Sequence, residues 1–402
     1  MSMTSEMPLP VRRGGLCPFS PAEEFRALRS SEPVCRTTLP GGEPSWVITR
    51  YADVRRVLGD TASFSNIAAG QGPMPPPRPE SREIPPPQEG FFVAYDPPEH
   101  TRLRRMVSSA FTMRRLSRLH SYVDSVVAEH LDAMEAAGPP VDLVQALALP
   151  LPSSVISELL GVPHADRAEL HRIGAMLFDL TTPPAAQAAN FDHVRAFMRD
   201  LIAHERAVPG DGLIGMLLRE HGEDLSDGEM TGICSLLLVA GYETTAKMIA
   251  LGVLLLLRHP EQLAILRDRP ELTAGAVEEM LRYLSVVHYG FVLTATRDVT
   301  IQGCRIRAGD YVMCALPSAN RDEALVPDPD RFDVTRRPVP HLAFGYGAHH
   351  CVGAALARIE LRACLPALFG RFPDLHLAVD PEEVVFETHS AVYGVRSLPV
   401  AW

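Results

Sequence analysis

Residues 344–353 read FGYGAHHCVG, and this stretch indicates the fold and chemistry of the 402-residue chain more strongly than any other. Its three glycines let the backbone turn sharply and approach a flat ligand with no Cβ atom in the way. A helix-forming apolar run follows from Ala354, which places the sulfur of Cys351 at a helix N-terminus. The positive end of the helix dipole there favours a thiolate, which suits a soft or borderline metal. A lone Cys is more often a small buried apolar residue, so its neighbours carry this prediction.

The stretch resembles the heme-binding signature of the cytochrome P450 superfamily, F-G-x-G-x-H-x-C-x-G, and every fixed position is matched. The resemblance extends over about residues 20–402 and implies a bacterial, actinobacterial-type soluble enzyme. It implies heme b (iron protoporphyrin IX) as the cofactor and Cys351 as the thiolate ligand of its iron. Phe344, Gly345 and Gly353 would shape the loop that holds the cofactor.

Glu279 and Arg282 form a second motif within the helical pattern of residues 276–284. An acid and a base at this spacing share a helix face and usually form a solvated pair worth a few tenths of a kcal/mol. The resemblance implies a buried pair instead, joined by Arg331 from the segment PDRF at residues 329–332. These three residues would form a structural triad that supports the Cys loop.

A long helix is predicted between residues 226 and 259. Ser226 and Glu229 have the spacing of a capping box at its start, and His259 followed by proline marks its end. Its length of roughly 30 residues corresponds to about 45 Å. The segment is apolar enough to be considered as a membrane span, but Glu243 and Lys247 near its centre argue against one.

Residues 240–245 of this helix read AGYETT, a poor choice for helix propensity. A Thr hydroxyl can bond to the carbonyl four residues earlier and distort the helix, so a kink in a core helix is one explanation. The resemblance implies instead that this sequence has a function. Glu243 and Thr244 would be the acid–alcohol pair that delivers protons on the distal side of the heme, with Ala240 and Gly241 beside the cofactor.

The segment DPPEHTRLRR at residues 96–105 predicts another helix, with Asp96 as its cap and two prolines in its first turn. His100 and Arg104 share one face of this helix, at a spacing that suits the binding of a carboxylate. In isolation the segment would usually be a solvated basic helix. The resemblance implies that both residues bind the heme propionates together with His349.

One position departs from the family pattern. In the segment LTATRDV at residues 293–299, Leu293 stands where many relatives have an Arg that pairs with a propionate. Either the propionates are held by His100, Arg104 and His349 alone, or the register is shifted and Arg297 contributes.

The resemblance implies that two segments cover a substrate cavity: the Pro- and Gly-rich residues 68–92, and residues 164–204, whose two helical patterns are joined at two prolines. Long loops inside compact domains are usually functional or disordered. An apolar cavity favours a bulky, largely apolar small molecule, which we expect to belong to natural-product biosynthesis. The fold does not identify the substrate. The predicted pocket residues are Phe91, Phe92, Phe178, Val239, Tyr289, Val292, Leu293 and Val392.

The expected fold is mainly α with small β-sheets, the α+β cytochrome P450 fold, with heme between the long central helix and the helix after the Cys loop. Strand-like runs occur at residues 45–50 and 311–315. The motifs are spread from residue 96 to residue 353 without a linker. We therefore expect an N-terminal tail, residues 1–20, and a single catalytic domain, residues 21–402.

Composition and charge narrow the class of protein. A hydrophobic content of 46% with 22% charged residues is typical of soluble globular proteins. Residues 1–21 lack a basic region followed by an apolar run, and the seven Cys have no framework spacing, so we expect a cytoplasmic monomer without membrane attachment. The formal charge of −11 argues against nucleic-acid binding.

An acidic ferredoxin, served by a ferredoxin reductase, would be attracted to basic residues on the two helices that flank the proximal heme face in this family. These residues are Arg102, Arg105, Arg114, Arg115, Arg358 and Arg362.

The predicted activity is that of a heme-thiolate monooxygenase, which uses O2 and two electrons from ferredoxin to hydroxylate, epoxidise or couple an organic substrate. A peroxygenase driven by H2O2 is one alternative, and members of that kind tend to lack the pair that Glu243 and Thr244 form. A non-catalytic heme protein that presents a substrate or recruits a partner oxygenase is another. The same pair counts against it, and ferredoxin-dependent NADPH consumption would distinguish the two.

Overall fold

The computed structural model describes residues 7–9, 13, 17–39, 42–67, 87–163, 183–287, 289, 291–388 and 390–402. The chain forms two compact units, each assembled from segments that are far apart in the sequence. Unit 1 comprises Met1–Arg104, Leu281–Phe332 and Val339–Cys351, and unit 2 comprises Arg105–Met280, Asp333–Pro338 and Val352–Trp402. The chain passes between them several times, in keeping with the absence of a linker in the sequence. The single domain over residues 21–402 stays a prediction, and residues 68–86 of the first predicted cavity cover and 164–182 of the second lie outside the described residues.

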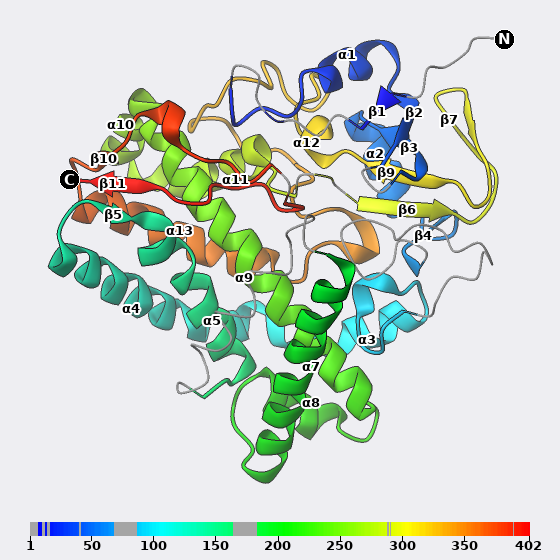
Figure 1. The fold of residues 1–402 in the computed structure, drawn as a ribbon, viewed down its shortest axis with the longest axis horizontal. Helices are drawn as coiled ribbons and strands as arrows, with labels where there is room; N and C mark the ends of the chain where they lie inside the picture. The colour runs from blue at the N-terminus through cyan, green and yellow to red at the C-terminus, as the bar shows by residue number, and fades with distance from the viewer. Residues whose placement is uncertain are drawn as a thin grey trace. The chain divides into compact units, whose positions relative to one another are not determined.

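Unit 1 is organised around a six-stranded sheet with the strand order β1-β2-β3-β9-β6-β4 (Figure 1). Strands β2 and β3 are antiparallel, β3 and β9 are parallel with Ser45 opposite Tyr311, and β9 pairs antiparallel with β6. Both strands predicted near residues 45 and 311 are present, and the structure shows that they are neighbours, which the sequence did not predict. The strands are β1 Met7–Pro8, β2 Val34–Thr38, β3 Pro44–Ile48, β4 Phe64–Ser65, β6 Phe291–Ala295 and β9 Tyr311–Cys314, and a separate hairpin has β7 Val299–Ile301 and β8 Cys304–Ile306.

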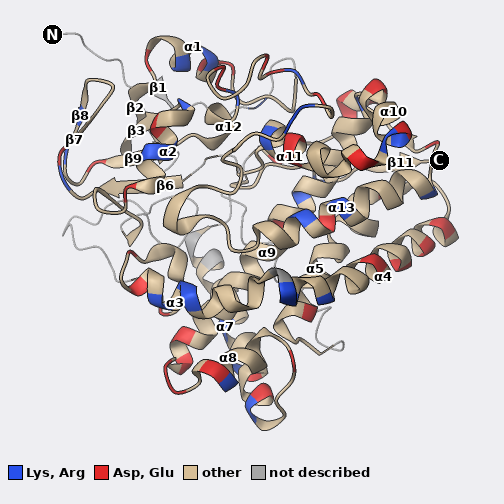
Figure 2. Cartoon of the chain, turned by 180° about the vertical axis from the view of Figure 1, so that it is seen from behind, with Lys and Arg blue, Asp and Glu red and all other residues tan. Residues whose placement is uncertain are grey.

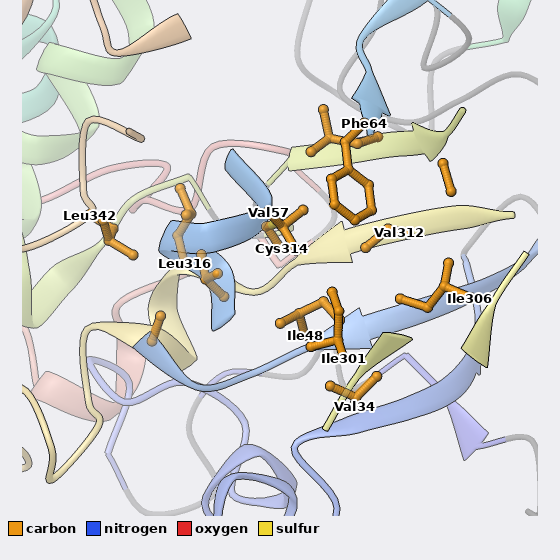
Figure 3. Packing of buried hydrophobic residues seen from close by; sticks show 14 residues of the cluster. Val34, Ile48, Val57, Phe64, Ile301, Ile306, Val312, Cys314, Leu316 and Leu342 are labelled. Carbon is orange, nitrogen blue, oxygen red and sulfur yellow. The ribbon is translucent and has the colours of Figure 1, made fainter. Parts of the chain in front are cut away.

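Buried side chains from the sheet and its helices form one apolar cluster in unit 1 (Figure 3). Phe64, Ile48 and Val312 come from three strands, and Val57 comes from α2. Each such side chain contributes about 1.5–3 kcal/mol when fully buried. The helical elements of this unit are α1 Glu24–Ser31, α2 Tyr51–Gly59, η2 Phe92–Ala94, α12 Leu316–Ala319 and η7 Gly347–His349.

Unit 2 is mainly helical, and its central helix is α9, Asp227–Leu257 (Figure 1). Helices α5, α7, α10 and α13 pack against α9, as does the π-helical turn η4. A small sheet has the strand order β10-β11-β5. The remaining bounds are η3 Ser109–Phe111, α4 Met113–Ala137, β5 Val141–Asp142, η4 Val144–Ala148, α5 Pro150–Leu160, α7 Pro184–Ala207, α8 Leu213–His221, α10 Pro260–Asp268, η6 Pro270–Leu272, α13 Ala354–Arg371, β10 His376–Leu377, η8 Pro381–Glu383 and β11 Pro399–Ala401. Two helices contribute to both units, α3 Glu99–Ser108 and α11 Thr273–Leu284.

Helix α9 begins at the predicted capping box. Glu229 N donates to Ser226 Oγ at 3.0 Å, and Ser226 N donates to Glu229 Oε2 at 2.9 Å. Among the described helices it alone is long and apolar enough to cross a membrane, yet 83% of its most apolar window is buried inside the structure. Such burial is typical of the core helix of a globular protein. The mainly α fold with small sheets is confirmed.

Candidate functional site

The Cys351 loop lies against α2 in unit 1. Cys351 N donates to Phe344 O at 2.9 Å, which closes the loop, and the thiol-bearing side chain is exposed. Gly345 and Gly347 have φ angles of 72° and 75°, a region that favours glycine. A Cβ atom on Gly347 would lie 2.7 Å from the carbonyl oxygen of Leu58. Both backbone conformation and close approach therefore require glycine at position 347.

Three groups able to carry positive charge come together beside this loop. His100 and Arg104 lie one turn apart on α3, and Arg104 Nη2 donates to the carbonyl oxygen of His350 at 2.6 Å. The rings of His100 and His349 have centroids 4.0 Å apart. His100 is 2% exposed, and both of its ring nitrogens are buried. Neither they nor Nε2 of His349 has a hydrogen-bond partner among the described residues.

Burial and the nearby charge of Arg104 lower the pKa of both imidazoles, which favours their neutral form. Desolvation, followed by the charge of Arg104, lowers the pKa of His100. Desolvation, His100 and Arg104 together lower the pKa of His349 to about 3. Burial also lowers the pKa of Arg104, an effect that Cys351 opposes. A guanidinium near the Cys351 sulfur favours its thiolate form.

The cluster fits an anionic ligand. A neutral imidazole has one N–H donor, and a buried donor without an acceptor costs about 1–3 kcal/mol. Carboxylates placed here would accept from His100 and His349 and would pair with the guanidinium of Arg104. The donor set therefore fits the two propionates of a heme whose iron Cys351 would bind. The structure brings together the three residues that the sequence predicted for this role.

Arg297 lies elsewhere in unit 1. Its Nε and Nη2 donate to Ser63 Oγ at 2.9 and 2.7 Å. The shifted register, in which Arg297 joins the propionate site, gains no support from this geometry. Leu293 belongs to the apolar cluster of the sheet, so an Arg there would bring a guanidinium among apolar side chains.

The predicted cap of α3 was wrong. The helix begins at Glu99, and the carboxylate of Asp96 accepts a hydrogen bond from Asn66 N at 2.9 Å. Asp96 therefore ties this segment to the chain after β4, although its backbone oxygen still accepts from His100 N. An Asp before a helix can bond either to the helix or to another segment, and local sequence does not distinguish them.

Helix α9 has one open face in unit 2. Between Met230 and Leu256 every residue is buried except Ala240, Gly241 and Thr244, which lie on one side of the helix. Thr244 Oγ1 donates to Ala240 O at 2.9 Å, the back-bonding expected from the sequence.

The neighbours of this open face are packed closely. A Cβ atom on Gly241 would lie 3.0 Å from Cδ1 of Ile156 on α5. Glu243 is buried, and burial together with Glu243 raises the pKa of Tyr242 to about 12. The open face thus presents a hydroxyl, with a buried acid at the preceding residue.

The structure shows hydrogen-bond partners for two members of the predicted triad, Glu279 and Arg282. Glu279 accepts from Arg336 Nε at 3.0 Å, an ion pair that sequence reasoning missed. Arg282 is fully buried and donates from Nη1 to two carbonyl oxygens, those of Asn320 and Pro329, both at 2.9 Å. The side chain of Arg331 is exposed, and its role in the triad stays a prediction.

The predicted pocket residues are buried side chains in both units. Phe91, Phe92, Tyr289, Val292 and Leu293 are buried in unit 1, and Val239 and Val392 in unit 2. The ring of Phe92 lies 6.3 Å from that of His100, so Phe92 packs beside the propionate cluster. Phe178 lies outside the described residues. A substrate-lining role for these positions stays a prediction.

Most of the arginines that were predicted to attract a ferredoxin have carboxylate partners. Arg358 donates to both oxygens of Glu278 at 2.7 Å, and Arg362 approaches the same carboxylate at 3.3 Å. Arg115 pairs with Glu220, and Arg102 with Glu99. Arg105 and Arg114 are exposed and form no ion pair within the described part of the chain. Figure 2 accordingly shows both charge signs along α4, α8 and α13. Fewer arginines are therefore available to attract an acidic partner than the sequence suggested.

Comparison with known proteins agrees with this site. The family model "Cytochrome P450" matches residues 205–392. "Cytochrome P450 165B3" of Amycolatopsis orientalis is 41% identical over the whole of both chains. "Mycinamicin IV hydroxylase/epoxidase" of Micromonospora griseorubida is 42% identical over 95% of each. Among solved structures, CYP105P1 in complex with filipin I has a TM-score of 0.91 and 40% identity, covering 99% of each chain. These full-length similarities establish that the chain belongs to the cytochrome P450 family and is an oxidoreductase with heme iron.

Proposed function

We propose that this enzyme is a monooxygenase that uses O2 and two electrons from a ferredoxin to oxidise a bulky, largely apolar small molecule in natural-product biosynthesis. The open face of α9 carries the proposal. On this face the side chain of Thr244 is accessible, although α9 is buried along most of its length. The neighbouring Glu243 is buried. A heme protein that only bound or presented a ligand would need no such acid–alcohol pair.

The residues of unit 1 would hold the cofactor as heme b. Cys351 would bind the iron through its sulfur, and His100, Arg104 and His349 would bind the propionates. When bound, the heme supplies the activation of O2, which amino-acid side chains do not provide. The thiolate ligand favours cleavage of the O–O bond.

Thr244 and Glu243 would control protons on the open face of α9. Because Thr244 Oγ1 donates its proton to Ala240 O, its lone pairs are available to accept another hydrogen bond. Rotation about the Cβ–Oγ1 bond breaks this donation and turns the hydroxyl proton toward the open face. The hydroxyl would then donate its proton to an acceptor at the open face, and a protonated carboxyl group of Glu243 would return a proton to Thr244 Oγ1.

The substrate class is supported by relatives. One relative is named a mycinamicin IV hydroxylase/epoxidase, and one similar structure contains filipin I. The buried apolar side chains of Val239 and Val392 fit a ligand that binds mainly by burial of apolar area. Leu293 does not contribute to this argument, because its side chain belongs to the core of the sheet.

The electron donor and the compartment are supported by charge and by cysteine chemistry. Arg105 and Arg114 remain available to an acidic ferredoxin, which a ferredoxin reductase would supply with electrons. All seven Cys of the chain are free thiols, as expected for a protein of the reducing cytoplasm.

An isotope experiment tests the proposal. The holoprotein is screened against apolar natural products for a shift of the heme spectrum, and the tightest binder is incubated with ferredoxin, ferredoxin reductase, NADPH and ¹⁸O2. We expect ¹⁸O in the product, with one oxygen atom inserted per hydroxylation or epoxidation. Oxygen derived only from added H2¹⁸O2 would indicate a peroxygenase. An absence of product together with ligand-independent NADPH consumption would indicate a non-catalytic heme protein.

A further inference from the structure

Lys247 is the only Lys among the 38 Lys and Arg residues of the chain. It lies in the middle of α9, one turn after Glu243, and its side chain is 9% exposed. Its ammonium group forms an ion pair with Glu387. Lys is a compact point charge on a flexible stem, whereas Arg ends in a larger planar fork, so the two are not equivalent at a tightly packed site.

Glu387 belongs to a hairpin near the C-terminus, which we call the C-terminal hairpin, described for residues 385–388 and 390–396. Phe386 bridges Val395, Glu387 N donates to Gly394 O, and Arg396 N donates to Val385 O, both at 2.9 Å. An isolated two-stranded hairpin is at best marginally stable in water. The C-terminal hairpin therefore depends on its contacts with the rest of unit 2, and its turn carries Val392, a predicted substrate-pocket residue.

Gly394 allows the Lys247 stem to lie along the hairpin backbone. A Cβ atom on Gly394 would be 2.1 Å from Cδ of Lys247 and 2.8 Å from its Cγ. No side chain fits between the two segments without movement. Lys247 is thus held by backbone along its stem and by Glu387 at its charged end.

We propose that the Lys247–Glu387 pair is a positioning device that fixes the C-terminal hairpin on α9, on the side of the helix that carries Thr244 three residues earlier, and thereby sets the space for bulky ligands at the open face. The inference rests on the proposed function, because the open face is where that function places the substrate. Removal of one partner leaves the other charge poorly solvated, which favours release of the hairpin from the helix. Removal of both charges avoids that penalty.

The test compares two inhibitors on the ferric holoprotein. Imidazole is small and serves as the reference, whereas clotrimazole is bulky and apolar, and binding of each is followed by the shift of the heme Soret band. We expect Lys247→Met and Glu387→Gln each to weaken clotrimazole binding about tenfold and to leave imidazole binding within about twofold. The double variant should bind clotrimazole more tightly than either single variant, because it leaves no unpaired charge and the effects of paired charges are not additive.

A matched control uses another ion pair of α9. Arg206 pairs with Asp227 at the exposed start of the helix, so Arg206→Met should change the affinity for neither inhibitor. Equal changes for both inhibitors, no change, or additive effects in the double variant would overturn the proposal. The absence of a Soret band in the wild-type protein would instead overturn the proposed function.

A second measurement does not require heme. In hydrogen–deuterium exchange, Lys247→Met should speed exchange at the amides of Glu387 and Arg396, which hold the hairpin together. Arg206→Met should leave those amides unchanged. Wild-type exchange rates at these amides in Lys247→Met would show that the ion pair does not hold the hairpin.

Discussion

Glu360 provides a direct test of the electrostatics of the core. It lies in α13, is buried, and its Oε2 has no hydrogen-bond partner among the described residues. Burial raises the pKa of this carboxyl group from 4.5 to about 8. The side chain is therefore mostly neutral in the folded protein at pH 7, whereas it is ionised in the unfolded chain.

The difference in protonation between the folded and unfolded chain determines whether stability rises or falls with pH. A folded-state pKa above the unfolded value means that Glu360 disfavours folding progressively as pH rises from about 4.5 to about 8. Each pH unit in that window costs about 1.4 kcal/mol. The accumulated cost is about 3 kcal/mol at pH 7 and approaches about 5 kcal/mol above pH 8.

Glu360→Gln removes the titration and nearly preserves the shape. We expect the stability of the variant relative to wild type to increase by about 3 kcal/mol between pH 4 and pH 7 and to level off above pH 8. Urea unfolding of both holoproteins at several pH values measures this difference. The buried amide adds a cost that does not depend on pH. The slope of the stability difference against pH is therefore the quantity that tests the prediction. A pH-independent difference, or one that shrinks as pH rises, would refute the reasoning.

Three further predictions concern the heme site. Cys351→Ala should abolish the thiolate-type absorption band of the reduced CO complex, and survival of that band would exclude Cys351 as the ligand. Arg104→Ala should reduce heme affinity at least tenfold, as measured by heme transfer to apomyoglobin, whereas Arg297→Ala should have little effect. A larger loss of heme affinity in Arg297→Ala than in Arg104→Ala would support the shifted register, in which Arg297 pairs with a propionate. Thr244→Ala should lower product formation by about 100-fold and divert NADPH to H2O2, and unchanged coupling would remove its hydroxyl from proton delivery.

Local patterns predicted the features that depend on neighbouring residues. The capping box of Ser226 and Glu229 marked the start of α9, and the hydroxyl of Thr244 bonds to Ala240 O as its position suggested. Cap geometry and back-bonding depend on residues three or four positions apart, so sequence spacing is informative. The contact of His100 with His349 could be predicted only through the family resemblance, because they are 249 positions apart in the sequence.

Contacts specific to this chain could not be predicted. Lys247 and Glu387 are 140 positions apart, and the ion pair of Glu279 with Arg336 depends on how the chain turns back after residue 332. The sequence predicts Leu293 as a pocket residue because an apolar side chain stands in place of an Arg; the structure buries it in the apolar cluster of the sheet, and a substrate-lining role stays a prediction. A strand has two faces, and burial alone does not show which of them a side chain occupies.

The arrangement of unit 1 has a consequence for synthesis on the ribosome. Strand β3 pairs with β9, Tyr51 donates to Pro340 O at 2.7 Å, and Gly347 lies against Leu58. The first 104 residues therefore emerge long before the partners that complete their fold. Domains generally fold as units, and contacts between distant segments form slowly. Capture of heme should consequently be a late event, after residue 351 has left the exit tunnel. Chains that stop earlier should expose the unpaired edge of β3 and depend on chaperones.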